Sequence, residues 1–359
     1  MKKIGKWIGT GAAVVMIILM VAVAWLYQGG SSFEPVETVG VEGSGGAIAR
    51  AGTPLKIMSW NIQYFAGKNY IFFYDLPDFK GEDTRPLSKD ITATFAEAVR
   101  VIQGENPDVL LLQEVDEGAG RTDKENQTQR LQSLLQSPFP YVAETFYWKA
   151  GFVPHSKIMG PVGMKLTILS RYPLEDGLRI ALPQQKKDFL SKRLDLQRCL
   201  LTARIQVPGE KPLRLINLHL EAFPEDPQLL RNQVNAFTQT VRRALARGER
   251  VVAARDFNLL PPHQYQALPP SQRYLYQPES EMTPMFEEFQ VIPGLAESDP
   301  NAASPWFTHF PNDKEVTGPD RTIDYILMDK GIKVISKYVR AGDTQHISDH
   351  LPVVVTIGL

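Results

Sequence analysis

The stretch ERVVAARDFNLLPP, residues 249–262, joins a short apolar run to a polar cluster. Residues 251–254 are apolar and are bounded by charges and by two prolines, which predicts a short buried strand. Because side chains alternate along a strand, Asp256 and Arg255 are expected to face opposite sides of the sheet. The strand therefore brings a carboxylate, followed two residues later by the amide of Asn258, to one end of a buried sheet.

Other apolar runs alternate with two amphipathic helices. One helix is expected over 90–103, where Gly104 stops it, and a second is capped by Asp226 and Pro227 and ends before Gly248. The further strands are expected at residues 55–62, 108–115, 165–170, 199–207, 213–220, 322–328, 333–339 and 351–357. This pattern predicts an α/β (α+β) fold, with two sheets and helices outside them.

Length and composition restrict the class of protein. The chain has 359 residues, of which 43% are hydrophobic, so it can bury a large core, and we treat residues 54–359 as one domain. The 39 basic and 40 acidic residues nearly cancel, which disfavours a strongly cationic nucleic-acid binder. Cys199 is the single cysteine, so neither an internal disulfide nor a cysteine metal site is expected.

The N-terminal region, residues 1–27, is expected to meet a membrane. Residues 8–27 carry no charge and have aromatic residues near both ends, which suits a membrane-spanning helix. Three lysines precede the span and three glutamates follow it, which places the remainder of the chain outside the cytoplasm. The alternative is a secreted protein whose signal peptide is cleaved near Ala24, after the A-x-A sequence at 22–24. The apolar run continues past that position and favours the uncleaved anchor.

Two further segments have a composition of their own. Residues 28–53 are rich in Gly and Ser and show no period, so they predict a flexible linker. The run YIFFYD, residues 70–75, lies between the first strand and the first helix. It is either a flap that completes the core or a lip that grips lipid or stacks on a base.

Polar groups stand at the ends of several expected strands. They are Asn61, Glu114, His219, Asp256, Asn258, Asp324, Asp349 and His350. Carboxylates and amides without thiolates are oxygen donors that suit Mg²⁺, with Mn²⁺ or Ca²⁺ as alternatives. A histidine that can pair with a carboxylate suits a general base.

Six short motifs carry a resemblance to a known family. They are SWNIQ (59–63), LLQEV (111–115), NLHL (217–220), RDFN (255–258), TIDYIL (322–327) and SDHLPV (348–353). In this order they resemble the endonuclease/exonuclease/phosphatase superfamily, whose fold is similar to that of pancreatic deoxyribonuclease. The resemblance implies a four-layer sandwich of two mostly antiparallel β-sheets flanked by helices, and metal-assisted hydrolysis of a phosphoester.

The resemblance also implies the metal ligands. Glu114 corresponds to the principal ligand, Asn61 lies beside it on the adjoining strand, and Asp349 completes the metal side. Taken singly, Asn61 and Asp349 could equally be structural residues at a strand end and a turn. The joint pattern favours a metal site.

The same resemblance assigns the remaining groups to catalysis. Asp256 orients or activates the attacking water, and Asn258 donates a hydrogen bond to the phosphate. His350 acts as base or charge stabiliser and is oriented by Asp324, which needs a partner because it lies within a strand. His219 donates to a phosphate oxygen or to the leaving group.

Three weaker features remain open. His155 and Arg198 could contact substrate phosphate, with solvation and a salt bridge as the respective alternatives. His263, His309 and His346 show no clear partner in the sequence.

Arg255 departs from the family, which usually has glycine before the aspartate. We interpret it as tolerated or damaging rather than catalytic, and the alternative is that it reaches a substrate phosphate.

The expected substrate is a phosphoester outside the cytoplasm. The anchor at 8–27, the balanced charge and the aromatic insertion favour a phospholipid or another envelope phosphodiester over nucleic acid. A surface nuclease is the alternative enzyme, and an inactive phosphoester-binding module is the alternative of another class. No protein partner is expected.

Overall fold

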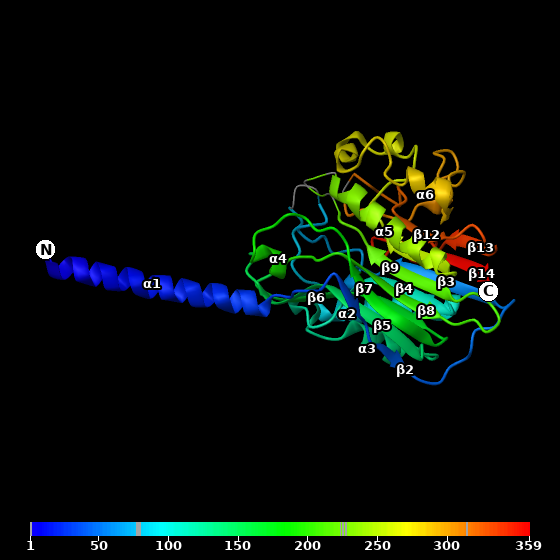
Figure 1. Cartoon of the computed structure of the whole chain (residues 1–359). Helices are drawn as coiled ribbons and strands as arrows, with labels where there is room; N and C mark the ends of the chain where they lie inside the picture. The colour runs from blue at the N-terminus through cyan, green and yellow to red at the C-terminus, as the bar shows by residue number, and fades with distance from the viewer. Residues whose placement is uncertain (1, 77–79, 223, 225, 227, 314) are drawn as a thin grey trace.

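Two packed β-sheets form the centre of the molecule. The computed structural model describes residues 2–76, 80–222, 224, 226, 228–313 and 315–359, with the backbone alone for 2–10 and 255. Within these residues each sheet has seven strands, and the two sheets lie face to face (Figure 1). Each sheet contains one parallel pair, and its other neighbours are antiparallel, so the predicted mostly antiparallel α/β sandwich is confirmed.

The strand orders are as follows. The first sheet runs β1 (Val36–Thr38), β7 (Leu174–Ala181), β8 (Cys199–Ile205), β9 (Leu213–His219), β10 (Arg250–Asp256), β12 (Asp324–Met328) and β11 (Gln290–Ile292). The second runs β13 (Val334–Val339), β14 (Val353–Gly358), β3 (Pro54–Asn61), β4 (Val109–Asp116), β6 (Gly160–Ser170), β5 (Tyr141–Val153) and β2 (Val41–Gly43). The parallel pairs are β9 with β10 and β3 with β4.

Three apolar layers explain the stacking. The inward faces of both sheets share one hydrophobic cluster. The outer face of the first sheet packs under α5 (Gln228–Ala246) and α6 (Thr283–Glu288), and that of the second packs under α2 (Ser88–Glu105) and α3 (Gln127–Leu134). Helix–sheet–sheet–helix packing is the four-layer sandwich that the resemblance implies.

Strand β10 shows the predicted alternation. Val252 and Ala254 lie in the cluster between the sheets, whereas Val251 and Ala253 pack under the helices. Polar contacts also join the sheets: Asn217 Nδ2 on β9 donates to the Leu112 carbonyl of β4 at 2.8 Å and to the Thr167 carbonyl of β6 at 2.9 Å. These hydrogen bonds fix the position of one sheet relative to the other.

The linker prediction for 28–53 is wrong for residues 36–43. There β1 pairs with β7 at the edge of the first sheet, and β2 pairs with β5 at the edge of the second. Backbone pairing with an exposed sheet edge needs no apolar period, so the composition concealed both strands. Strands β5 and β7 were also not predicted, because polar residues interrupt their apolar pattern.

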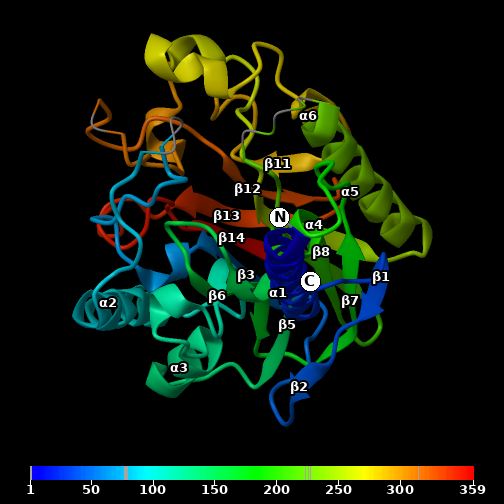
Figure 2. The same cartoon turned by 90° about the vertical axis from the view of Figure 1, so that its left-hand side faces the viewer.

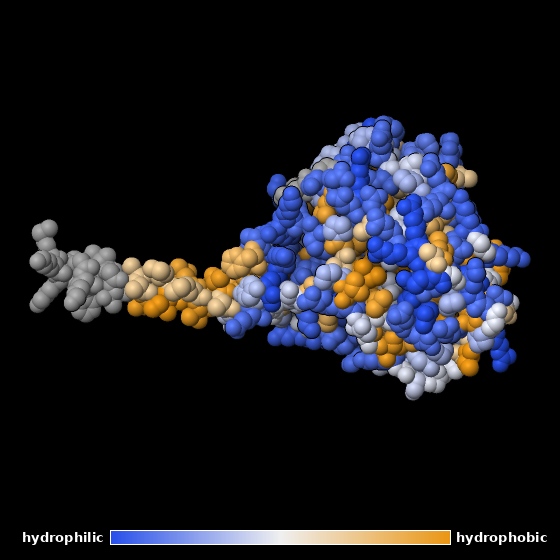
Figure 3. Space-filling view, in the orientation of Figure 1, coloured by the Kyte–Doolittle hydropathy of each residue, from blue (hydrophilic) through white to orange (hydrophobic). Residues whose placement is uncertain are grey.

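The helix boundaries agree with the expectations to within two residues, but the prediction that Gly104 stops the first helix is wrong: α2 runs through Gly104 to Glu105 and ends at Asn106, which adopts the left-handed conformation. Asp226 caps α5, since its Oδ1 accepts from the Gln228 backbone N–H at 2.9 Å, whereas Pro227 lies outside the described residues. Helix α1 (Lys2–Gly29) projects away from the sandwich (Figures 1 and 2). Its segment Gly11–Gly29 is long and apolar enough to cross a membrane and is not buried against the domain. Its apolar surface is continuous in Figure 3.

Candidate active site

The polar strand ends meet at one edge of the sandwich. Strands β3 and β4 are parallel, as are β9 and β10, so each pair presents its carboxyl ends together. Strands β12 and β14 run in the opposite direction and bring their amino ends to the same edge. In the register of the first sheet, Asp256 pairs with both His219 and Asp324.

Glu114 reaches the site through an irregularity in β4. The pairing with β6 shifts between Leu112 and Val115, and Glu114 itself adopts a φ of 57°. Such a bulge re-aims a side chain at a strand end. Its Oε1 accepts from Asn61 Nδ2 at 3.0 Å.

Asp256 lies at the centre of the cluster and is buried. Its Oδ2 accepts from Asn61 Nδ2 at 3.1 Å, and its Oδ1 accepts from the backbone N–H of Asn258 at 3.0 Å. The same Oδ2 is 3.4 Å from His219 Nε2 and 3.5 Å from His350 Nε2. One carboxylate therefore faces both histidines.

His350 is held from behind by Asp324. Its Nδ1 lies 2.9 Å from Asp324 Oδ2 and 3.1 Å from Oδ1, which leaves Nε2 directed toward Asp256. Burial opposes protonation of His350, but the carboxylates of Asp324, Asp256 and Asp349 outweigh it and raise the pKa of the imidazole. The cationic form is favoured on this side of the site.

His219 has the opposite character. Its Nδ1 lies 3.3 Å from the Tyr147 hydroxyl and 3.7 Å from Glu114 Oε1. Burial, together with the charges of Arg198 and His350, lowers the pKa of His219 well below its usual value. A neutral imidazole is therefore favoured here, and it can donate at one nitrogen and accept at the other.

The carboxylates of the cluster resist ionisation. Burial and the nearby Asp349 raise the pKa of Glu114 to about 7, and burial is the main cause that raises the pKa of Asp256 to about 6. Burial likewise raises the pKa of Asp324. Buried acidic groups crowded in this way favour a cation between them, so the donor set fits a divalent metal.

The metal ligands predicted from the sequence need one qualification. Glu114 and Asp349 offer carboxylate oxygens, but Asn61 is oriented with its amide nitrogen toward Glu114 and Asp256. Its Oδ1 accepts from the Gln63 backbone N–H at 3.1 Å. As oriented, Asn61 holds two carboxylates together. Two triads are also spaced closely enough to hold an ion: His309, Asp349 and His350, and Asp256, Asp324 and His350.

Three residues were not predicted as part of the site. The ring of His309 lies 4.5 Å from that of His350, and Tyr147 contacts His219. Burial and the charge of Asp349 raise the pKa of Asp75, the last residue of the YIFFYD run. Only Asp75 had a sequence signal, since that insertion was recognised as a candidate lip; the others carry no local motif.

The insertion at 70–75 lies partly in the core and partly along the cavity, and its role as a lip stays a prediction. Phe72 is buried and packs edge-on against Tyr64, as a core flap would. Phe73, by contrast, stacks on the ring of His155 at 4.6 Å, and both line the cavity with Tyr74.

The remaining open residues fall in different places. Arg198 forms a salt bridge, which was one of its two alternatives, with its Nη2 3.6 Å from Glu221 Oε1, and it also lines the cavity. His346 Nε2 lies 3.5 Å from Glu97 Oε2 at the surface. The side chain of Arg255 lies outside the described residues, so its interpretation stays a prediction.

The cluster lies in a cavity of about 880 Å³. Its polar wall includes Glu114, His219, Asp256, Asn258, Asp349 and His350. Apolar and aromatic side chains also line the cavity, among them Trp148, Leu194, Leu196, Tyr274 and Tyr276. This lining suits a ligand that combines a phosphate with an apolar group.

The sequence also matches a family model. The model for the Endonuclease/Exonuclease/phosphatase family aligns with residues 58–350. The chain belongs to this family. Its members are hydrolases of phosphoester bonds that use divalent metals, and the chain is a hydrolase of this class, as predicted.

Solved structures share the fold. An endonuclease/exonuclease/phosphatase from Beutenbergia cavernae is 22% identical, with a TM-score of 0.54, over 85% of this chain and 72% of that one. The human Nocturnin catalytic domain is 17% identical, with a TM-score of 0.51, over 89% and 96%. A D. rerio TDP2 complexed with single strand DNA product is 16% identical, with a TM-score of 0.50, over 86% and 100%. A search of curated proteins found no match.

Proposed function

We propose that the protein is a divalent-metal-dependent phosphodiesterase that acts outside the cytoplasm on a phospholipid or another envelope phosphodiester. The observation that carries this proposal is the convergence of Glu114, His219, Asp256, Asp349 and His350 on one cavity that apolar and aromatic side chains also line. The polar groups suit a head-group phosphate, and the apolar side chains suit an acyl or glyceryl portion.

Glu114 and Asp349 are the proposed metal ligands, with Asn61 beside them. Their oxygen donors favour Mg²⁺, with Mn²⁺ or Ca²⁺ as alternatives. A bound ion supplies positive charge that stabilises the phosphoryl oxygens. Asn61 donates hydrogen bonds to Glu114 and to Asp256. It therefore holds the proposed metal ligand Glu114 in a fixed position relative to Asp256, the residue proposed to orient the water.

Asp256 is placed to orient the attacking water and to accept its proton. Its carboxylate is held in place by hydrogen bonds from Asn61 and from the backbone N–H of Asn258. It therefore needs little rearrangement during the reaction, and the free-energy cost of reorganisation is small. Cationic His350, oriented by Asp324, stabilises negative charge on the phosphate. Neutral His219 lies across Asp256 from His350 and can donate to a phosphate oxygen or the leaving group.

The position of α1 supports a substrate at the membrane. The short helix α4 (Ser191–Leu194) lies between α1 and the cavity: Arg193 Nε donates to the Tyr27 carbonyl of α1 at 2.9 Å. On its other side the Leu194 carbonyl accepts from Trp148 Nε1 at 2.9 Å, and both residues line the cavity.

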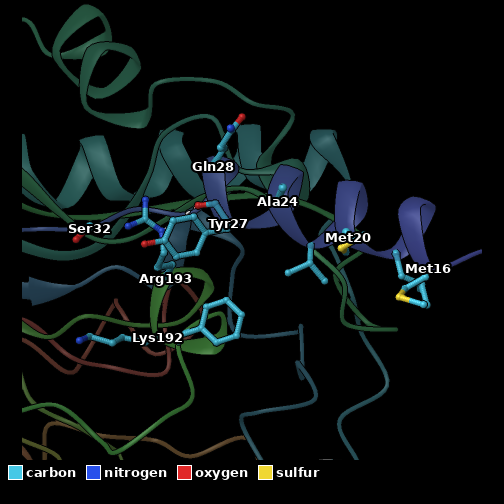
Figure 4. A pocket seen from close by; sticks show the side chains of 11 residues that line it. Met16, Met20, Ala24, Tyr27, Gln28, Ser32, Lys192 and Arg193 are labelled. Carbon is cyan, nitrogen blue, oxygen red and sulfur yellow. Dashed lines mark hydrogen bonds between the residues drawn. The ribbon is translucent and has the colours of Figure 1, made fainter. Parts of the chain in front are cut away.

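A groove lies between α1 and the segment that contains Phe189, Lys192 and Arg193 (Figure 4). Tyr27 and Arg193 meet there, and Phe189 lies 6.1 Å from the ring of Tyr27 with 65% of its surface exposed. When α1 spans a bilayer, this groove and the adjoining rim of the cavity lie close to the lipid surface. Trp25 and Tyr27 join the end of α1 to the domain, and both residues follow Ala24, so these contacts would be present with or without cleavage at that site.

A turnover assay tests the proposal. Full-length protein in lipid nanodiscs is supplied with Mg²⁺, Mn²⁺ or Ca²⁺ and offered bis-p-nitrophenyl phosphate, phosphatidylglycerol, sphingomyelin, and single- and double-stranded DNA. We expect metal-dependent turnover of the model diester and of a lipid. Turnover of DNA alone would establish the surface nuclease, which the shared fold with a DNA-bound TDP2 keeps as second candidate. No turnover with any ion would contradict the proposal and favour a binding module.

A further inference from the structure

Arg198 is a buried arginine whose hydrogen bonds are incomplete. It immediately precedes β8 and is 4% exposed. Among the described residues neither its Nε nor its Nη1 has a hydrogen-bond partner, whereas Nη2 lies 3.6 Å from Glu221 Oε1. Buried guanidinium groups normally satisfy their N–H donors, so the two unpaired nitrogens of this cavity-lining residue lack an acceptor that a ligand in the cavity would supply.

The open guanidinium lies next to the candidate active site. Its central carbon is 5.4 Å from the centre of the Tyr147 ring, and the Tyr147 hydroxyl is 3.3 Å from His219 Nδ1. Arg198, His219 and Glu221 all line the same cavity. One aromatic ring therefore separates Arg198 from the histidine that faces Asp256.

We propose that Arg198 forms a second anion subsite, which binds a phosphate of the substrate other than the one that is hydrolysed. This inference rests on the proposed function and narrows it: the preferred substrate is a phospholipid whose head group carries two phosphates. Arginine suits this task because its planar N–H donors form strong charge-assisted bonds to phosphate oxygens. Glu221 holds one nitrogen and leaves the other two for the ligand. The neighbouring Trp148 and Leu196 suit the apolar part of a lipid.

The chain offers a matched control. Arg179 on β7 is 1% exposed, and its Nη1 also has no hydrogen-bond partner among the described residues. Its other nitrogens, however, donate to the carbonyls of Phe146 at 3.3 Å and Gln197 at 2.9 Å, and it does not line the cavity. The two arginines are alike in burial and differ in access to the cavity.

The first test uses inorganic phosphate with EDTA, so that the metal site takes no part. Full-length protein is titrated with phosphate and its thermal unfolding is followed. We expect phosphate to raise the Tm of the wild type and of Arg179→Gln. In Arg198→Gln the apparent Kd should be weakened by about tenfold or more, with Arg198→Lys between them. Equal phosphate shifts in the wild type and in Arg198→Gln would overturn the subsite.

The second test measures substrate choice. Phosphatidylglycerol has one phosphate and cardiolipin has two, and both are presented in nanodiscs with Mg²⁺. We expect the ratio of kcat/KM for cardiolipin over phosphatidylglycerol to fall about tenfold in Arg198→Gln, mainly through KM, and to be unchanged in Arg179→Gln. An unchanged ratio in Arg198→Gln would overturn the two-phosphate preference. Absence of turnover on both lipids would instead contradict the proposed function, while the phosphate titration would still report on Arg198.

Discussion

Strands β9 and β10 have charged groups at both ends. At one end these groups form arginine–carboxylate ion pairs, whereas at the other end several carboxylates lie close together beside histidines. At the end remote from the cavity, Arg214 Nε donates to Glu249 Oε2 at 2.9 Å and Nη2 donates to Asp176 Oδ2 at 2.6 Å. At the other end, Asp256 has two histidines and an amide around it, with further carboxylates nearby.

The pKa directions express this contrast. Burial is the largest single influence on Glu249 and opposes its ionisation, but the hydrogen bonds and charges of Arg214 and Arg247 together outweigh it and lower the pKa. The hydrogen bond from Arg214 also lowers the pKa of Asp176. In the cavity, burial raises the pKa of Asp256 to about 6 and that of Glu114 to about 7. At the remote end, oppositely charged side chains pair and stabilise the fold. At the cavity end, the carboxylates are held in surroundings that disfavour their ionised form, which a bound cation would stabilise.

The largest effect is expected from Glu114→Gln. Loss of the proposed principal metal ligand should lower kcat by about 1000-fold, because a bound ion supplies several kcal/mol of transition-state stabilisation. The rise in Tm that Mg²⁺ gives the wild type should shrink, while the Tm in EDTA stays equal or increases, because a crowded carboxylate is removed.

The matched change at the remote end is Glu249→Gln. It should lower the Tm in EDTA and leave the Mg²⁺ shift intact. A full Mg²⁺ shift in Glu114→Gln would show that the ion binds elsewhere.

The next effect is expected from Asp324→Asn. Without the carboxylate behind it, His350 loses its orientation and its preference for the cationic form, so kcat should fall about 100-fold with little change in KM. Steady-state kinetics on bis-p-nitrophenyl phosphate measure this. The control is Asp329→Asn beyond the other end of β12, where Oδ2 accepts from the Val251 backbone N–H at 3.0 Å. That variant should be less stable but should keep the kcat of the wild type. Equal kcat values in the two variants would contradict the proposal that Asp324 orients His350.

At the remote end, Arg214→Met should change stability and leave catalysis alone. Breaking the buried pair leaves Glu249 without its main partner and should lower the free energy of unfolding by about 3 kcal/mol at pH 7. Folding lowers the pKa values of Glu249 and Asp176. Their ion pairs therefore contribute fully to the free energy of unfolding above the pKa values of the unfolded chain, about 4. This contribution is lost as the pH falls through the lower pKa values of the folded protein. Urea denaturation at pH 7 and pH 3 should therefore show the difference shrinking, and a constant difference would contradict the ion-pair explanation.

The smallest effect is expected from Phe189→Asp in the groove beside α1. A charge there should weaken contact with the lipid surface and lower the ratio of lipid turnover to bis-p-nitrophenyl phosphate turnover by about threefold. The control is Ile335→Asp on β13, which is similarly exposed but remote from α1. An equal loss in both variants would indicate a general effect of charge rather than a lipid-facing rim.

The amino-acid sequence alone determined the sandwich and most of the cluster. Apolar runs and alternation depend on neighbouring residues, so β10 and its two faces could be predicted locally. Six motifs in family order indicated Glu114, Asp256 and His350, and the structure places these groups in one cavity.

Tertiary structure decided what depends on contacts between distant segments. The contact between the tilted rings of His309 and His350, the contact of Tyr147 with His219 and the orientation of the Asn61 amide have no local signature. Strands β1 and β2 exist because edges of other strands were available to pair with them. That two nitrogens of Arg198 have no hydrogen-bond partner among the described residues likewise follows only from the tertiary structure, because whether a hydrogen bond is satisfied depends on the whole surroundings of the group.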